Sequence, residues 1–421
     1  MKMPFLGRDE GGLIRHGAML VVGTFVGALC NAGFHAVVGR TLPNAEYGSL
    51  VAMLGIILAT TTPMLAVQNT LAHYISAFVR DGRRAEIRPL FRHWLRIFAA
   101  LSAAIALGAF GLREPLAAFW RVEPALIALT FLVLAASLWM NLYYGLLQGM
   151  QSFGWLSWAP QAWGSVRLLL GWVLTATVAA RALLAVGAQG VGVLAVLVLC
   201  AFAAAGLRLP AGVAAAPPRG TYRYLGSALV CLAGYAMLMN LDTALAKHYF
   251  DAETTGLFSK AATIARTAVF LPVPIATALF PKVTSTGELT DASWGLLGRA
   301  LAFAGLLIAA TAGVCLAFPQ LPWTILYRAW PAADAALAAQ LTRAMVLAMS
   351  PLALAYLLLN FEMAQRRFAW CYGLVPCGAA YVVGVARFHA HPAQIAVVVG
   401  ALNLVAVALL LASICAQRRR G

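Results

Sequence analysis

Two adjacent apolar segments between residues 227 and 285 are each long enough to cross a lipid bilayer, yet both carry charged side chains. The first contains Asn240 and Asp242, and the second contains Lys260 and Arg266. A charged side chain in hydrocarbon costs about 2.5–3.5 kcal/mol on insertion scales, so such groups normally face the interior of a helix bundle. The pattern predicts a membrane protein with a polar interior.

The composition agrees with this interpretation. The chain has 421 residues, of which 62% are hydrophobic and 10% charged, and its mean hydropathy is +0.84. Soluble domains are far less apolar, whereas polytopic helical membrane proteins have this composition. The net charge of +16 is divided among short Lys/Arg clusters between apolar runs, which is typical of cytoplasmic loops. We therefore expect no nucleic-acid partner.

About 20 predominantly apolar residues are needed to cross a bilayer as a helix. Twelve segments meet this criterion, and most Lys and Arg residues fall in alternate connections between them, which predicts cytoplasmic N- and C-termini. The N-terminus lacks a signal-peptide pattern, so we expect the first segment to remain as a helix. The predicted helices cover residues 17–38, 48–70, 94–112, 124–147, 155–179, 182–206, 225–247, 256–280, 297–318, 338–361, 368–386 and 393–415.

A segment of different character divides the chain almost in half. Residues 207–224 contain three prolines and have arginines near both ends, which predicts a cytoplasmic linker. It separates an N-terminal six-helix lobe, residues 1–206, from a C-terminal six-helix lobe, residues 225–421.

A short internal repeat supports this division. Asn31 precedes Gly48 by 17 residues in the first half, and Asn240 precedes Gly256 by 16 residues in the second. With six helices per half, the two copies have the same orientation and are related by an axis along the membrane normal.

The charged residues of the seventh and eighth segments have two interpretations. Counted outward from the turn near Asp251, Asp242 and Lys260 fall at about the same depth on antiparallel helices. They either pair and hold the two helices together or take part in transport. Asp242 is the only acidic residue predicted deep in a span, so it is the default carrier of a coupling H+ or Na+. The sequence has no GxxxxGK[ST] motif, which argues against ATP hydrolysis.

Three regions resemble the multidrug/oligosaccharidyl-lipid/polysaccharide (MOP) superfamily, and within it the Wzx-like O-antigen and polysaccharide flippases. These are residues 39–48 (GRTLPNAEYG), the polar residues from Asn240 to Val283, and the basic region Arg80–Arg96. The resemblance implies an all-α protein with two six-helix lobes around a central cavity that opens alternately to the two sides. It implies a bacterial inner-membrane protein that moves an undecaprenyl-diphosphate-linked sugar outward for surface polysaccharide biosynthesis. A polysaccharide polymerase and glycosyltransferases are the implied partners, beside the membrane lipids.

Such a substrate requires cations for its diphosphate and hydrogen-bonding groups for its sugars. Arginine suits the diphosphate because its fork of donors matches phosphate oxygens. The candidate cations are Arg40, Arg167, Lys247, Lys260 and Arg266, and the candidate sugar-binding residues are Asn31, Gln68, Asn69, His73 and Asn240.

Several of these residues have an alternative role. Arg40 and Lys247 lie near predicted span ends, where long cationic side chains extend to the membrane interface. Asn69 and His73 are one helical turn apart and could instead join neighbouring helices by hydrogen bonds.

Two other functions fit an apolar chain less well. A cation-coupled multidrug exporter of the same fold would need an acidic, aromatic cavity, whereas most interior charges here are cationic. A membrane-embedded glycosyltransferase or polymerase would need a sizeable extracytoplasmic loop, and the longest outside connection, residues 319–337, is short. We predict no catalytic residues, no metal site and no cofactor other than a coupling ion.

Overall fold

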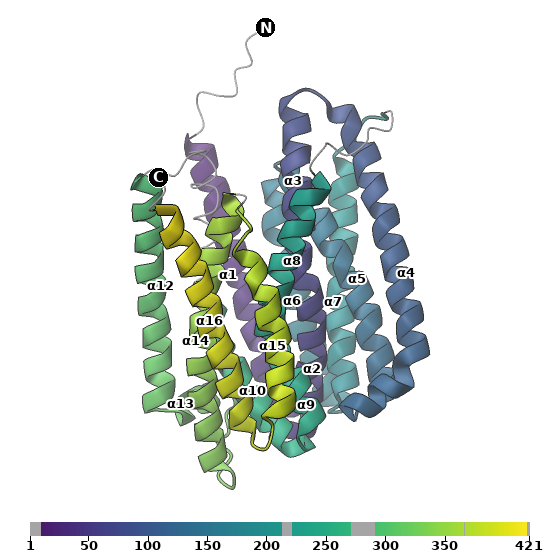
Figure 1. The fold of residues 1–421 in the computed structure, drawn as a ribbon. Coiled ribbons are helices and arrows are strands. Elements are labelled where there is room, and N and C mark those ends of the chain that lie inside the picture. Colours follow the sequence, from purple (N-terminus) through teal and green to yellow (C-terminus); the bar gives the residue numbers. More distant parts are fainter. Residues whose placement is uncertain (1–9, 213–220, 271–290, 366, 419–421) are drawn as a thin grey trace.

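The computed structural model describes residues 10–212, 221–270, 291–365 and 367–418, and within these ranges the chain is helical apart from short connections (Figure 1). The first half contains α1 (Glu10–Thr41), α2 (Asn44–Thr61), α3 (Leu65–Arg80), α4 (Ile87–Trp120), α5 (Pro124–Gly149), α6 (Phe153–Thr177) and α7 (Ala182–Gly206). The second half contains α8 (Thr221–Asn240), α9 (Asp242–Tyr249), α10 (Ala252–Phe270), α12 (Asp291–Ala317), α13 (Gln320–Tyr327), α14 (Ala335–Ala364), α15 (Leu374–Arg387) and α16 (Pro392–Arg418).

Each of the twelve predicted spans corresponds to one helix or to one broken helix, so the predicted all-helical fold is confirmed. The second span is α2 and α3 together, and the seventh is α8 and α9 together. Within the described residues, eight helices are long and apolar enough to cross a membrane, and the bent α8–α9 pair is a ninth. The other three predicted spans correspond to the more polar α6 and α10 and to the shorter α15.

Some boundaries differ from the prediction. Helix α4 begins at Ile87 rather than residue 94, and α8 begins at Thr221, inside the predicted linker. Residues 213–220 of that linker, and residues 271–280 of the predicted eighth span, lie outside the described residues.

Two of the predicted spans, the second and the seventh, are broken helices. Pro63 lies in a 3-10 turn (Thr62–Met64) between α2 and α3, because proline cannot complete the α-helical hydrogen-bond ladder. Helices α8 and α9 meet at Leu241 and bend by 49°. A break of this kind leaves backbone carbonyls without helical donors, so nearby side chains must satisfy them.

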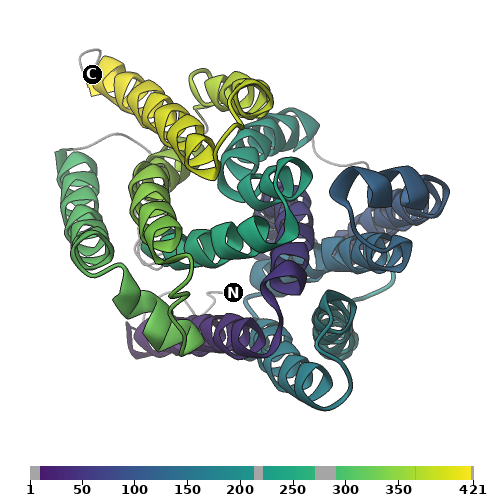
Figure 2. The same ribbon diagram turned by 90° about the horizontal axis from the view of Figure 1, so that it is seen from below.

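Different helices and turns lie at the two ends of the bundle, and we name each end after one helix found there. At the α3 end, drawn at the top of Figure 1, lie the start of α1, the end of α16 and the turn between α3 and α4. At the α9 end, drawn at the bottom, lie α9, α13 and the start of α2. Figure 2, seen from the α9 end, shows α13 lying against α1 at the edge of the bundle.

The helices of each half pack mainly on one another, and α2 joins the halves by packing on α8, α9 and α10. The crossing of α2 and α10 is unusually close at two glycines. A Cβ added to Gly256 would lie 2.3 Å from the carbonyl oxygen of Asn44, and one added to Gly48 would lie 3.1 Å from the nitrogen of Gly256. Small residues allow this approach. The equivalent glycines of the predicted repeat therefore touch each other.

Candidate functional site

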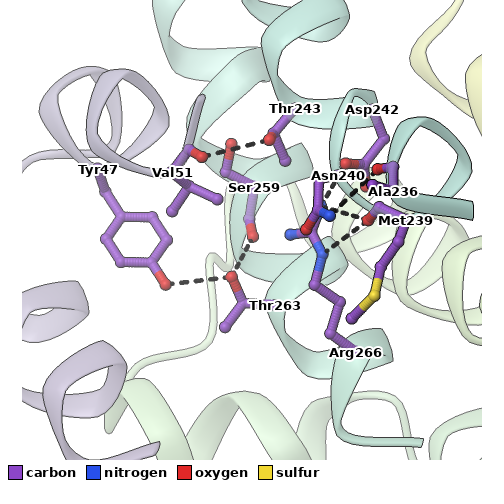
Figure 3. Close-up of polar contacts among 10 residues, drawn as sticks. All are labelled: Tyr47, Val51, Ala236, Met239, Asn240, Asp242, Thr243, Ser259, Thr263 and Arg266. Atoms are coloured by element: carbon purple, nitrogen blue, oxygen red, sulfur yellow. Dashed lines mark hydrogen bonds and ion pairs between the residues drawn. The ribbon is translucent and has the colours of Figure 1, made fainter. Parts of the chain in front are cut away.

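An ion pair between α9 and α10 is buried at the break in the seventh span (Figure 3). Asp242, the first residue of α9, is fully buried, and its Oδ1 accepts a hydrogen bond from Nη2 of Arg266. The same guanidinium reaches the carbonyl oxygen of Met239 at 3.4 Å. Oδ2 of Asp242 has no hydrogen-bond partner among the described residues. The pair is neutral as a whole but incompletely hydrogen-bonded.

The predicted pairing of Asp242 with Lys260 is wrong, since the partner of Asp242 is Arg266, farther along α10. Two features account for the difference. The 49° bend makes depth counted along a straight helix misleading. In addition, helical side chains lean toward the N-terminus of their helix, so the long Arg266 side chain can reach back toward α9.

Asn240 is the last residue of α8 and is almost fully buried. Its Nδ2 donates to the carbonyl oxygen of Ala236 at 3.1 Å. A Cβ at Gly55 on α2 would lie 2.5 Å from the carbonyl oxygen of Asn240, so the backbone of α2 packs closely against the backbone of Asn240. The side chain bonds back to its own helix, and the predicted role in sugar binding has no support from these contacts.

A second buried guanidinium lies in the first half of the chain and has only neutral partners. Arg167 on α6 is 2% exposed and donates to Oε1 of Gln189 on α7 at 2.7 Å and to Oδ1 of Asn31 on α1. Its guanidinium carbon lies 4.3 Å from the ring centre of Phe34 and 4.1 Å from that of Trp163. In the part of the chain that the structure describes, no carboxylate forms an ion pair with Arg167 and its Nε has no acceptor.

Two side chains lie between these guanidiniums. His35 on α1 is within electrostatic range of both Arg167 and Arg266, and its Nδ1 lies 3.2 Å from the hydroxyl of Tyr47 on α2. The Tyr47 hydroxyl donates to Oγ1 of Thr263 on α10 at 3.3 Å (Figure 3). A chain of polar contacts therefore connects the two halves through the middle of the bundle.

Lys260 on α10 lies near the same tyrosine, Tyr47, toward the α9 end. Its Nζ donates to Oδ1 of Asn44 at 2.7 Å, and Nδ2 of Asn44 donates to Glu253. The ammonium lies 5.7 Å from the ring centre of Tyr47 and 5.3 Å from that of Tyr327. The two tyrosine hydroxyls are 3.2 Å apart. These contacts join α2 to α10 and α13 at this end of the bundle.

The two cations predicted near span ends differ in burial, since Arg40 is exposed and Lys247 is buried. Arg40 donates from Nε to the carbonyl oxygen of Leu326 at 2.8 Å and from Nη2 to that of Ile325 at 2.9 Å. It therefore satisfies the last turn of α13. Lys247 on α9 is 5% exposed and lies within electrostatic range of Glu46. Such burial is not expected of a side chain that extends to the membrane interface.

The predicted polar group on α3 lies apart from these residues. Nε2 of Gln68 donates to Oε1 of Gln148 on α5 at 3.0 Å. His73 is exposed and packs edge-on against the ring of Tyr74, and Asn69 is half-buried. The structure therefore does not bring Gln68, Asn69 and His73 to Arg167 or Arg266.

The interior is cationic on balance. Arg167, Lys260 and Arg266 are directed into it, whereas Asp242 is the only carboxylate that contacts one of the two buried guanidiniums among the described residues. A second acidic side chain, Glu362, is also buried, but it lies two residues from the end of α14.

Four residues of this network were not predicted, namely His35, Tyr47, Gln189 and Tyr327. Each is a single polar or aromatic residue in or beside an apolar run, without a spacing pattern of its own. The available signal was weak: Tyr47 lies in the residue 39–48 motif, and Gln189 is the one amide in an otherwise apolar segment.

Outside the spans, Asp251 precedes α10 and its Oδ1 accepts the backbone N–H groups of Glu253 and Thr254, both at 3.0 Å. The Thr254 side chain, together with these backbone bonds, stabilises the carboxylate and lowers the pKa of Asp251 below its ordinary value of 3.8. The residue is the N-cap of α10.

No protein-family model and no curated protein matches this sequence, but solved structures do. An inward-facing multidrug resistance MATE family transporter of the MOP superfamily has a TM-score of 0.76 at 11% identity, covering 93% of this chain and 96% of that one. The lipid II flippase MurJ in an inward closed conformation has a TM-score of 0.71 at 11% identity, covering 94% and 87%. An outward-facing MATE family transporter of the MOP superfamily has a TM-score of 0.67 at 12% identity, covering 99% and 98%. The chain therefore shares its fold with these membrane transporters.

Proposed function

We propose that this chain is a flippase that moves a polyprenyl-diphosphate-linked oligosaccharide across the bacterial inner membrane by alternating access, for surface polysaccharide biosynthesis. The observation that carries the proposal is Arg167, a buried cation without a carboxylate partner among the described residues. Taking a charge out of water costs several kcal/mol, and an ion of opposite charge offsets that cost. A diphosphate supplies the missing negative charge.

The surroundings of Arg167 favour an anionic substrate over a cationic one. Arg167, Lys260 and Arg266 repel an organic cation, and Arg266 already holds the nearby carboxylate of Asp242. An exporter of cationic drugs, which is the alternative on this fold, would gain from the opposite balance of charge. Asn31 and Gln189 keep Arg167 in place by hydrogen bonds and leave Nε free for a phosphate oxygen.

We propose that the α3 end faces the cytoplasm, since the basic residues Arg80–Arg96 lie there and cytoplasmic loops are rich in Lys and Arg. The contacts of Tyr47, Tyr327 and Lys260 then close the outer side. The higher TM-score to the inward-facing transporter, 0.76 against 0.67 for the outward-facing one, supports an inward-facing state. In this proposal residues 1–206 and 225–421 are the moving bodies, and a polysaccharide polymerase and glycosyltransferases are the partners.

The test is a flipping assay in proteoliposomes that contain polyprenyl-diphosphate-linked oligosaccharide, comparing the wild type with Arg167→Gln. Flipping by the variant should fall at least about tenfold, because a charged hydrogen bond is worth about 1.5–3 kcal/mol. Arg92→Gln, which removes an exposed arginine of α4, is the matched control and should flip normally. Efflux of a cationic dye by the folded wild type, without flipping of the lipid, would overturn the proposal.

A further inference from the structure

The two members of the buried ion pair differ in how a ligand could reach them. The side chain of Asp242 is 0% exposed and that of Arg266 is 10% exposed. Arg266 also lies within electrostatic range of His35 and Tyr47 in the middle of the bundle. An anion that enters the bundle therefore meets the guanidinium and not the carboxylate.

The pair itself is incomplete. Arginine and a carboxylate commonly form two parallel hydrogen bonds, but Asp242 uses only Oδ1, and Oδ2 has no partner among the described residues. The titratable groups within electrostatic range of Asp242 are Arg266 of α10 and Tyr381 of α15. No second cation contacts this carboxylate in the described ranges.

We propose that Asp242 is an exchangeable counter-ion: the substrate diphosphate takes its place on Arg266, and the displaced carboxylate binds one proton. This inference rests on the proposed function and adds a proton-linked step to it. No covalent bond is broken. The diphosphate gains the hydrogen bonds of the guanidinium, and one proton from solution joins Oδ2 of Asp242.

The proton follows from the burial of Asp242. A carboxylate that loses its only cationic partner is left as an uncompensated buried charge, at a cost of about 3–5 kcal/mol. A buried group in that position becomes neutral by binding a proton. The exchange also limits the change in net charge, because part of the negative charge that the diphosphate brings is offset. Arg167 has no carboxylate to displace, so binding at Arg167 takes up no proton.

The experiment measures proton uptake by the full chain in lipid nanodiscs, with geranylgeranyl diphosphate as the probe. Calorimetric titrations in two buffers of different ionisation enthalpy give the number of protons bound with each probe molecule. The diphosphate itself also titrates, and Asp242→Asn reports that contribution. We expect the wild type to bind about one proton more than Asp242→Asn, and the variant to bind the probe about tenfold tighter, a difference of about 1.4 kcal/mol.

Glu123→Gln is the matched control, since it removes an exposed carboxylate that pairs with Arg181 at the α9 end. It should keep the proton uptake of the wild type. The pH dependence gives a second test: as the pH falls, the affinity of the wild type for the probe should rise relative to that of Asp242→Asn, in which the diphosphate titrates but residue 242 does not.

Equal proton uptake by the wild type and Asp242→Asn, with the probe bound by both, would overturn the counter-ion exchange and leave the flippase proposal standing. A folded wild type that binds no diphosphate at any pH would overturn both proposals. Folding of each variant is checked by its elution volume and its thermal midpoint.

Discussion

The two halves of the molecule each bury one arginine, and they satisfy it in different ways. In the first half, Arg167 is held by the neutral amides of Asn31 and Gln189 and by two aromatic rings. In the second half, Arg266 is held by the carboxylate of Asp242. The first arrangement keeps a net positive charge in the bundle, and the second cancels it. The comparison shows that a buried cation can be positioned without being neutralised.

The largest effect is expected at the neutralised site. Arg266→Gln leaves the Asp242 carboxylate buried without a cation, so the free energy of unfolding should fall by about 3–5 kcal/mol. Denaturant unfolding of the detergent-solubilised protein measures the change. Adding Asp242→Asn to the same chain removes the unpaired charge and should recover most of the loss. A double variant as unstable as Arg266→Gln alone would show that the carboxylate is not the cause.

A smaller loss is expected at the site with neutral partners. Arg167→Gln should lower the free energy of unfolding by about 1–3 kcal/mol, because Asn31 and Gln189 lose hydrogen bonds but no opposite charge is exposed. The same unfolding measurement applies. If Arg167→Gln destabilised the chain more than Arg266→Gln, the difference between the two arrangements would not hold.

The first site can also be converted into the second. Asn31→Asp places a carboxylate beside Arg167 and should form an ion pair like that of Asp242 with Arg266. Binding of geranylgeranyl diphosphate should then weaken about tenfold, equivalent to about 1.4 kcal/mol, because the substrate must displace the new partner. Calorimetry on Asn31→Asp and on Asn31→Gln as the neutral control measures this. Equal affinities would show that Arg167 does not contact the anion.

The smallest effect concerns the starts of the two equivalent helices α2 and α10. Asp251 caps α10, whereas Pro43 precedes α2 without a side-chain cap. Asp251→Ala should cost about 0.5–2 kcal/mol at neutral pH. The pKa of Asp251 is lowered in the folded state. The stabilisation that the ionised carboxylate gives to the folded state is therefore fully present above the ordinary pKa of 3.8, and it is lost as the pH falls through the lower folded-state pKa.

Unfolding measured from neutral pH down to pH about 3 should therefore show the wild type and Asp251→Ala converging. A constant difference over that range would contradict the role of the ionised carboxylate.

Hydrophobic runs were enough to predict the helices, because each run must bury its backbone polar groups in a helix to cross lipid. They did not predict the bend at Leu241, because the hydrophobicity of a run gives the length of a span and not its straightness, and the polar residues Asn240 and Asp242 beside the bend were interpreted only as interior groups. The mistaken partner of Asp242 follows from that missing bend. Arg40 contacts α13 at a residue 286 positions away in the sequence, and the residue pattern of neither helix predicts this contact.

The sequence predicted which charged residues lie in the interior but not which of them contact one another. The interior positions of Arg167, Asp242, Lys260 and Arg266 follow from the cost of charge in lipid. Which of them meet depends on how the halves pack, and that is set by close contacts of small residues such as Gly48 and Gly256.

The crossing of α2 and α10 at these glycines also bears on how the halves can move. Interlocked side chains must change rotamer before two helices can turn against each other. At this crossing the two glycines have no side chain to change, and side-chain atoms come only from Asn44 and Thr255. We therefore expect the crossing to act as a fulcrum at which displacement is smallest. A tilt of about 10° about this point moves groups about 30 Å away, roughly the thickness of the hydrocarbon layer, by about 5 Å. Small angular changes at two residues without side chains would thus become large displacements at the α3 end.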